Sequence, residues 1–526
     1  MAEKFRAQDN FSTDDANAAA TPFAASLDGR DVLLLDTTLR DGEQAPGVSL
    51  STTEKVDIAR ALDRAAVPFV EAGSACTGAG ERDAIARVAD LGLDATVTSF
   101  ARGVRADVDL ALDCGVDGVN LVVPASDRHV EGKVGTDRDS VVETTVELVE
   151  HARDHGLWVE VLGEDGSRAD VDFLDRLAAA AHDAGADRFC YCDTVGHGSP
   201  EHTERVVSRL AEHGPTSTHV HDDLGFAMTN VHASLRAGAD LVHATVNGVG
   251  ERAGNVALEE VAVALSHCYG VDCANLDELY SLAQTVARAT ETPLPPNKAV
   301  VGENAFAHES GIHTDGTLKD EAMYEPYPPE TVGRERRLVL GKHAGRAGVR
   351  AALDEHGVEV TDDELARVVE RVKGLAERGK RVTDADLLTV AEDVQGRARE
   401  RRVRLVDLQA TSGGGVPTAS VRLAVDDEER VAAGTGNGPV DAAVEAVRTA
   451  LGPDAAFQLE SYHVDAISGG TDAVVTVEVE LSRGDRSVSV AASDADITRA
   501  SVVAMVDALD RLRAPKAVAD VPPADD

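Results

Sequence analysis

The chain has 526 residues, more than one hydrophobic core usually supports, so two or more domains are expected. Its formal net charge of −42, with 93 acidic against 51 basic residues, disfavours nucleic acids and anionic membranes as partners. Such an acidic surface suits a halophilic, high-salt cytoplasm in which screening relieves self-repulsion, and a generally acidic protein of a low-salt cell is the alternative.

Residues 1–30 are polar and lack the apolar core of a signal sequence, so they are predicted to form a flexible arm. No apolar stretch reaches membrane-spanning length. The six cysteines are scattered without a disulfide framework, which indicates a reducing compartment and predicts a cytoplasmic protein. Cys190 and Cys192 flank Tyr191 in an apolar run and are interpreted as strand residues rather than metal ligands.

Eight short apolar runs alternate with charged segments of helical periodicity between Leu33 and Gly248, within a predicted catalytic domain of residues 31–292. The runs are LLLDTT, FVEAGS, ATVTSF, GVNLVV, WVEVLG, RFCYCD, STHVH and LVHATVNG. This alternation predicts parallel strands joined by crossover helices. Eight units over this length favour a closed (β/α)8 TIM barrel over an open doubly wound sheet, and the glycine-rich turn of a Rossmann fold is absent after the first run.

Two further regions follow the predicted barrel. Residues 293–402 begin with a proline break and a loop-rich glycine- and histidine-containing segment, then become helical from about 345, and they are predicted to form linking subdomains. Residues 403–515 twice repeat a pattern of strands, a glycine cluster and one helix, which predicts a separate α+β domain with internal two-fold symmetry. Residues 516–526 are predicted to be a disordered acidic tail.

Polar side chains gather where the predicted strands end, which is the functional face of a barrel. His219 and His221 are two apart on one strand, so both rings project from the same face. Asp41 follows the first strand and Asn255 the eighth, and these strands are neighbours in a closed barrel. The four residues predict a site for Mg²⁺, Mn²⁺ or Zn²⁺ with open positions for substrate, and ordinary strand histidines are the alternative.

Other residues at or beyond these strand ends have two interpretations each. Arg40 could polarise a bound 2-oxo acid together with the metal, or pair with a loop carboxylate. Glu164 could be a general base, an acceptor in the metal shell or a solvated loop carboxylate. The glycines of NGVGERAGN permit close approach of a ligand, although most such runs are turns. His308 and His313 lie in a predicted loop, where histidines are usually surface residues.

Two long motifs, DTTLRDGEQAPGVSL and HVHDDLGFAMTNVHASLRAGADLVHATVNGVGERAGN, resemble the paired signatures of the 2-isopropylmalate, homocitrate and citramalate synthase family. The similarity runs from about Val32 to Leu512, with ENAFAHESGIHTDG, YEPYPPETVG and LGKHAGR resembling the linking subdomain and SGGGVPTASV and SGGTDAVV the allosteric C-terminal domain. The resemblance implies an acyltransferase that condenses acetyl-CoA with a small 2-oxo acid. The methyl group of acetyl-CoA loses a proton, the enolate attacks the keto carbon, and water cleaves the thioester.

The resemblance also implies roles for individual residues. Those around the divalent metal are Asp41, His219, His221 and Asn255. Those that hold the 2-oxo acid are Arg40 and Thr194, and those that serve proton transfer are Glu164, His313 and Tyr324, with Glu251 nearby. In this family the histidine at the position of His313 often comes from the partner subunit, so a homodimer is expected. One departure is Asp222, which stands where the family's HxHND motif has an amide and adds a negative charge beside the metal.

The acceptor substrate is predicted from EAGSACTGAGER and NLVVPAS, which resemble the archaeal type of the citramalate branch. Leu121, in place of a small polar side chain, is predicted to narrow the pocket in favour of pyruvate. The first hypothesis is therefore citramalate synthesis from pyruvate in isoleucine biosynthesis, and the alternative is 2-isopropylmalate synthesis from 2-oxoisovalerate in leucine biosynthesis. Isoleucine or leucine is the expected effector, bound near Gly413–Gly415 and Gly469–Gly470. A non-catalytic, amino-acid-sensing regulator is the alternative of another class.

Overall fold

The computed structural model describes residues 27, 29–320, 323–377, 382–396, 401–413, 415–426, 428–452, 456–466, 475–484 and 486–513. Most of the predicted arm 1–30 and the whole predicted tail 516–526 lie outside these ranges. The chain divides into two compact units, one of residues 1–306 with 325–336 and the other of residues 307–324 with 337–526. Within the described ranges, no helix combines the length and the apolar character that crossing a membrane requires.

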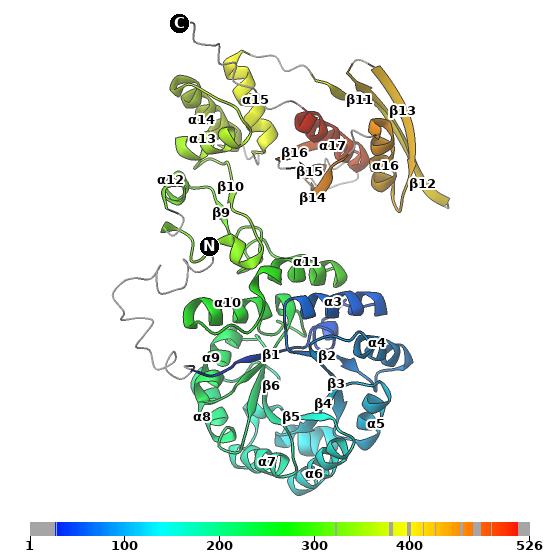
Figure 1. Ribbon diagram of the computed structural model, residues 1–526, viewed down its shortest axis with the longest axis vertical. Coiled ribbons are helices and arrows are strands. Elements are labelled where there is room, and N and C mark those ends of the chain that lie inside the picture. Colours follow the sequence, from blue (N-terminus) through cyan, green and yellow to red (C-terminus); the bar gives the residue numbers. More distant parts are fainter. Residues whose placement is uncertain are drawn as a thin grey trace, which may run out of the picture. The chain divides into compact units, whose positions relative to one another are not determined.

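Eight parallel strands form a closed barrel in the first unit, as the sequence predicts (Figure 1). They pair in chain order, and β8 closes the barrel by pairing with β1. The strands are β1 (Leu33–Asp36), β2 (Phe69–Ser74), β3 (Thr96–Arg102), β4 (Gly118–Pro124), β5 (Trp158–Glu164), β6 (Arg188–Asp193), β7 (Thr216–Val220) and β8 (Leu241–Ala244).

Helices surround the strands, and polar caps define where several of them begin (Figure 1). Ser51 forms a capping box with Glu54, and Asp137, Asp170 and Ser199 each accept a hydrogen bond from the third residue of the helix that follows. The helices are α3 (Thr52–Arg64), α4 (Ala79–Ala89), α5 (Arg105–Asp113), α6 (Arg138–Asp154), α7 (Val171–Asp183), α8 (Pro200–Leu210), α9 (Ala227–Ala237), α10 (Leu258–Tyr269) and α11 (Leu279–Ala289).

Short helical turns occupy several loops between these elements. They are η2 (Gly42–Gln44), η3 (Arg128–Val134), η4 (Gly166–Arg168), η5 (Val246–Gly248), η6 (Leu276–Glu278) and η8 (Pro329–Val332). Of these, η2, η3, η4 and η5 directly follow the loops at the carboxyl ends of β1, β4, β5 and β8. They therefore belong to the rim of the barrel that carries function in this fold.

Strand β4 shows which side chains face the barrel interior. The side chain of Asn120 donates a hydrogen bond to Glu71 on β2 across the interior, with an Nδ2 to Oε1 distance of 2.8 Å. Leu121 instead lies in the apolar cluster that β4 shares with the surrounding helices, together with Val119 and Val123. Because successive side chains of a strand point to opposite sides, Leu121 faces outward. The prediction that Leu121 narrows the substrate pocket is therefore wrong.

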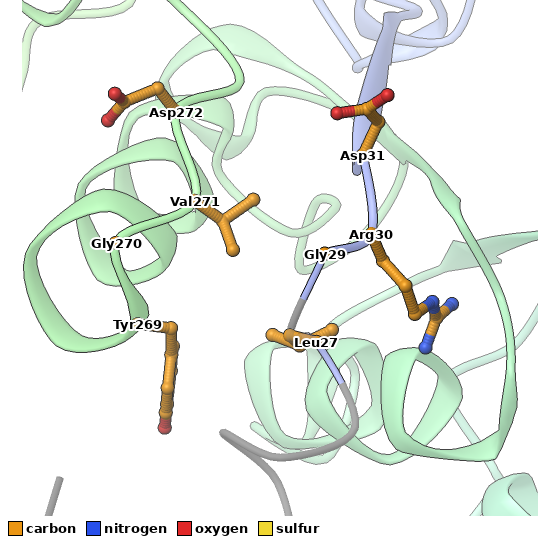
Figure 2. A pocket seen from close by; sticks show the side chains of 8 residues that line it. All are labelled: Leu27, Gly29, Arg30, Asp31, Tyr269, Gly270, Val271 and Asp272. Carbon is orange, nitrogen blue, oxygen red and sulfur yellow. The ribbon is translucent and has the colours of Figure 1, made fainter. Parts of the chain in front are cut away.

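The opposite end of the barrel contains a separate pocket of about 310 Å³ (Figure 2). One wall comes from residues 29–31 just before β1, and the facing wall comes from Tyr269, Val271 and Asp272 after α10. Arg30 is held there by hydrogen bonds to the carbonyl oxygens of Leu235 and Ala239. None of the residues predicted for catalysis, substrate binding or metal binding lines this pocket.

The second unit begins with β9 (Ala307–His308), which pairs in parallel with β10 (Arg337–Leu338). His308 therefore lies on a short strand, and His313 lies on α12 (Gly311–Lys319), so the prediction of a loop for both histidines is wrong. Gly311 and Gly316 weaken the helical signal of this segment in isolation. The predicted helical stretch follows as α13 (Arg346–Glu355), α14 (Asp362–Glu377) and α15 (Asp384–Gln395).

The rest of this unit is the predicted α+β pseudo-repeat. Each half is a three-stranded antiparallel sheet followed by one helix, and side chains of both halves share one apolar core. The first half is β11 (Val403–Gly413), β12 (Gly415–Val425), β13 (Glu428–Thr435) and α16 (Pro439–Leu451). The second half is β14 (Gln458–Ala466), β15 (Val475–Arg483), β16 (Arg486–Asp494) and α17 (Ile497–Arg513). Gly414, Gly469 and Gly470 of the predicted glycine clusters lie outside the described residues.

Replacing Leu121 by alanine is expected to lower the free energy of unfolding of the barrel by about 2 to 5 kcal/mol, because it leaves a cavity between β4 and the helices. The single tryptophan of the chain, Trp158 on β5 beside β4, reports this unfolding by fluorescence during denaturant titration. Leu224→Ala, at a 61% exposed leucine, is the control and should change stability by no more than about 0.5 kcal/mol. A change in acceptor preference without loss of stability would instead place Leu121 at the pocket.

Candidate active site

The loop after β1 places Arg40 and Asp41 at the rim of the barrel. The carbonyl oxygen of Thr37 accepts hydrogen bonds from the amides of Arg40, Asp41 and Gly42 at 3.1, 2.7 and 3.1 Å, which makes the turn tight. Arg40 Nε donates to Glu71 Oε2 at 2.6 Å, and Arg40 Nη1 lies 3.1 Å from Asp41 Oδ1. The guanidinium also lies over the ring of Phe100 at 4.8 Å. The guanidinium is thereby held in one orientation by three interior groups.

Asp41, His219, His221 and Asn255 come together as predicted. Asp41 Oδ2 lies 3.2 Å from His219 Nε2 and 3.7 Å from His221 Nε2, and it accepts a hydrogen bond from Asn255 Nδ2 at 2.9 Å. The carboxylate and the two imidazoles form a group whose candidate ligand atoms all lie within 4.8 Å of one another. All four residues are buried, and Asp41 is only 2% exposed.

The donor chemistry of this group fits a divalent cation. One carboxylate and two imidazoles are common ligands of Mn²⁺ and Zn²⁺, and ligand atoms about 3 Å apart match metal bonds of about 2.0 to 2.2 Å. In addition, Asn255 Oδ1 is buried without a hydrogen-bond partner among the described residues. Burying an amide oxygen without a hydrogen bond costs free energy, so Asn255 Oδ1 is available to accept a bond from a ligand at this centre.

Electrostatics keep these groups in the protonation states that a cation requires. Burial alone would raise the pKa of Asp41, but the positive charge of Arg40 and the hydrogen bond with His219 outweigh it and hold the pKa well below its usual range. Burial, with the neighbouring His219, lowers the pKa of His221 to about 4. At neutral pH Asp41 is therefore an anion and His221 a neutral imidazole, and both are able to bind a metal ion.

Glu164, at the end of β5, is paired with two basic residues of η3. Lys133 Nζ donates to its two carboxylate oxygens at 2.6 and 2.8 Å, and His129 Nδ1 lies 3.0 Å from Glu164 Oε2. The Glu164 side chain is 20% exposed, so it is neither buried in the core nor freely solvated. The interpretation of Glu164 as a solvated loop carboxylate is wrong, because both of its oxygens are engaged.

Thr194 follows β6 and is held by two neighbouring loops. Its Oγ1 accepts a hydrogen bond from the amide of Asp165 at 2.9 Å, and its carbonyl oxygen accepts one from Arg252 Nη2 at 2.9 Å. Arg252 also donates to Asp223 at 2.8 and 3.0 Å. Glu251 pairs with Arg252 at 3.2 Å, and its side chain is 49% exposed. Arg252 thus links the loops after β6, β7 and β8, while Glu251 lies at their solvent edge.

The side chain of Asp222, which stands where the family motif has an amide, is held by a hydrogen bond. Asp222 Oδ1 accepts a hydrogen bond from the amide of Ala227 at 2.9 Å, at the start of α9. An acceptor at the amino-terminal end of a helix satisfies an otherwise unpaired amide and interacts favourably with the helix dipole. This contact engages one oxygen of the Asp222 carboxylate at the start of α9.

An apolar patch faces the interior of the barrel below these polar groups. Val122 on β4 packs against Leu162, Cys190 and Cys192 on β5 and β6. Val122 is one residue from Leu121 and therefore points to the opposite side of β4. Val122 therefore faces the interior on this strand, together with Asn120.

His313 and Tyr324 belong to the second unit. Their rings lie 4.3 Å apart with an interplanar angle of 32°, and Tyr324 is 42% exposed. The two side chains therefore form a pair on the same unit. Their part in proton transfer stays a prediction.

Sequence reasoning missed several groups around the predicted residues. They are Glu71, Phe100, Val122, His129 and Lys133. The sequence does contain a signal for Glu71, because a carboxylate inside an apolar strand needs a buried positively charged side chain as its partner. The pairing of η3 with Glu164 had no comparable signal, since it depends on how the loop after β4 folds over the end of β5.

Comparisons with known proteins cover most of the chain. Residues 31–286 match the HMGL-like family model, residues 300–380 match the homocitrate synthase post-HMGL domain-like model, and residues 381–513 match the LeuA allosteric (dimerisation) domain model. The CimA protein of Methanothermobacter thermautotrophicus is 51% identical over 486 residues, which cover 92% of this chain and 98% of that protein. The (R)-citramalate synthase CimA of Methanocaldococcus jannaschii is 46% identical over 487 residues, covering 91% of this chain and 99% of that protein.

Replacing Asp41 by asparagine is expected to weaken Mn²⁺ binding by roughly tenfold or more, because it removes the one negative charge among the candidate ligands. Free Mn²⁺ measured by electron paramagnetic resonance during titration gives the affinity. Asp175→Asn is the matched control, since Asp175 pairs with Arg209 and His213 away from the strand ends. Equal affinity in the Asp41 variant and the wild type would rule out a metal centre at this position.

Proposed function

The chain belongs to the (R)-citramalate synthase family, and from this premise we propose that its barrel condenses acetyl-CoA with pyruvate to give (R)-citramalate and CoA, in isoleucine biosynthesis. The observation that carries this function is the 46% to 51% identity to proteins of this family over more than nine tenths of the chain. The enzyme is an acyltransferase, and the group of Asp41, His219 and His221 at the barrel rim suits that chemistry.

In the proposed reaction Asp41, His219 and His221 hold a divalent cation, with Asn255 beside them. Mg²⁺ or Mn²⁺ is the proposed ion and Zn²⁺ the alternative, in line with one carboxylate and two imidazoles as ligands. When bound, the cation acts as a Lewis acid that polarises the keto group of the acceptor. The mutual distances and the buried, unpaired Asn255 Oδ1 support this assignment.

Arg40 and Thr194 are proposed to hold the 2-oxo acid. Burial would lower the pKa of Arg40, but Glu71 and Asp41 outweigh it and raise the pKa above its usual value, so the guanidinium stays charged. Its fixed positive charge is suited to the carboxylate of the acceptor. The hydroxyl of Thr194 accepts a hydrogen bond from Asp165 and keeps its own proton to donate to the same carboxylate.

Proton transfer is proposed to involve Glu164, His313 and Tyr324, with Glu251 nearby. One group must accept a proton from the methyl carbon of acetyl-CoA while the new carbon–carbon bond forms. Glu164 is oriented by Lys133 and His129 and remains at the rim. His313 and Tyr324 stack as a pair on the second unit, and we propose that the chain acts as a homodimer in which His313 serves the partner's barrel.

Pyruvate is favoured over 2-oxoisovalerate by the family assignment and by the apolar interior patch at Val122. A valine on β4 leaves room for a methyl group, whereas a branched chain needs more volume. The 2-isopropylmalate synthase alternative therefore ranks second. A non-catalytic regulator is disfavoured because Arg40, Asp41, His219 and His221 form an assembled centre that such a role does not need.

The domain limits and the location in the cell remain proposals. We propose a catalytic domain at residues 31–292, linking subdomains at 293–402 and a regulatory domain at 403–515, which agrees with the start of β11 at Val403. All six cysteines are free thiols, in keeping with a reducing, cytoplasmic setting. The net charge of −42 supports small-molecule substrates rather than nucleic acids or membranes as partners.

The acceptor is tested by following CoA release by the purified full chain in buffer of high potassium concentration with Mg²⁺ or Mn²⁺. A kcat/KM at least tenfold higher with pyruvate than with 2-oxoisovalerate is expected, because rejecting extra carbon atoms in a narrow apolar pocket is worth about 1 to 3 kcal/mol. Val122→Ala is expected to reduce this ratio by raising activity with 2-oxoisovalerate. Leu121→Ala, on the outward face of the same strand, is the control and should leave the ratio unchanged. A preference of the wild type for 2-oxoisovalerate would assign the chain to leucine biosynthesis.

Effector binding is proposed for the C-terminal domain, with isoleucine ahead of leucine. The match to the allosteric (dimerisation) domain and the two similar halves around one core support it. Hydrogen–deuterium exchange on the full chain is expected to show protection by isoleucine confined to residues 403–513, accompanied by inhibition of CoA release. Protection of the barrel instead would point to competition at the active site, and protection by leucine alone would reverse the choice of effector.

A further inference from the structure

A second cluster of metal-ligating side chains lies inside the barrel, away from the loops of the candidate active site. Glu160 on β5, Cys190 on β6 and His243 on β8 place one candidate ligand atom each within 4.8 Å of one another. None of the three is more than 1% exposed. The function proposed above assigns no task to Glu160 or His243, and it uses Cys190 only as part of the apolar patch beside Val122.

The geometry of Glu160 and His243 is unusual for a simple ion pair. His243 Nε2 and Glu160 Oε2 are 2.9 Å apart, yet both atoms lack a hydrogen-bond partner in the described part of the chain, and so does His243 Nδ1. Two ligand atoms about 3 Å apart match metal bonds of about 2.0 to 2.2 Å.

The carboxylate is held in place from its other side. Ser217 on β7 donates a hydrogen bond to Glu160 Oε1, which leaves Oε2 facing His243. A ligating carboxylate that is itself hydrogen-bonded is typical of metal sites in proteins. The ring of His243 also packs edge-on against that of His219, with centroids 5.4 Å apart.

Cys190 has a second thiol beside it on β6. Cys190 Sγ and Cys192 Sγ are 3.8 Å apart on the same face of β6. Of the two, only Cys190 belongs to the group whose candidate ligand atoms all lie within 4.8 Å of one another. Both cysteines lie on β6, as the sequence predicts.

A bound cation would change the protonation state of Cys190. Burial raises the pKa of the Cys190 thiol well above its usual value, and Cys192 beside it raises the pKa further. A divalent ion reverses this preference, because it stabilises the thiolate directly. One glutamate and one thiolate then balance the two positive charges within the apolar interior.

We propose that Glu160, Cys190 and His243 form a second Zn²⁺ site inside the barrel. Sulfur, imidazole and carboxylate ligands together select Zn²⁺ over Mg²⁺ and Mn²⁺. The centre of Asp41, His219 and His221 contains no sulfur, so the two centres differ in chemistry and are distinguished by spectroscopy.

The test uses Co²⁺ as a probe, bound to the full chain after removal of other metals. Two ions per chain, measured by inductively coupled plasma mass spectrometry, and a thiolate-to-cobalt charge-transfer band in the near ultraviolet are expected. Asp41→Asn should lose one ion and keep the band. Cys190→Ser should lose one ion together with the band, whereas Cys114→Ser, at a buried thiol outside the cluster, should lose neither.

The wild-type spectrum tests the second metal site even if Cys190→Ser does not fold. Glu160→Gln provides a second variant at the cluster. A single ion per chain with no charge-transfer band would overturn the proposal and leave Glu160 and His243 as a buried ion pair. Neither readout depends on catalysis, so failure of the second site would leave the proposed acyltransferase activity untouched.

Discussion

The hydrogen bonds between β1 and β8 are the interaction on which the rest of the candidate site depends. They pair Leu33–Asp36 with Leu241–Ala244 and so close eight parallel strands into a ring. Parallel strands in a ring have all their carboxyl ends at one rim. Asp41 and Asn255, which are 214 positions apart in sequence, thereby come within 2.9 Å of each other. A barrel that failed to close would separate the candidate metal ligands.

Closure also creates an interior that is unusually polar. Glu71 and Glu160 are both fully buried there, and each is matched: Glu71 by Arg40 and Asn120, Glu160 by His243 and Ser217. Removing one member of such a pair leaves an uncompensated buried charge, which is strongly destabilising. The polar contacts inside the barrel therefore fix the positions of side chains and also affect stability. Arg40 is a clear case, because its orientation at the rim is set by a glutamate on a different strand.

Basic residues at the rim are engaged by carboxylates throughout this acidic protein. Arg40 pairs with Glu71, Lys133 with Glu164, and Arg252 with Asp223. Salt screens exposed pairs more than buried ones. Because Arg40 is buried and Lys133 is 57% exposed, high salt weakens the second pair more than the first. The orientation of Arg40 is thus the more robust feature under the saline conditions that the composition suggests.

The sequence by itself determined the barrel, the two-fold repeat of the C-terminal domain and the gathering of Asp41, His219, His221 and Asn255, because each depends on periodicity or on the ends of strands. Strand β4 marks the limit of that reasoning. A strand buried on both sides is apolar throughout, so the sequence GVNLVV says little about which side chains face the barrel interior. The contact between Asn120 and Glu71 decided that Val122, and not Leu121, lies inside. The same holds for η3, whose His129 and Lys133 meet Glu164 through the folding of a loop. Contacts between separate segments are decided by tertiary structure, since neither segment alone encodes their distance.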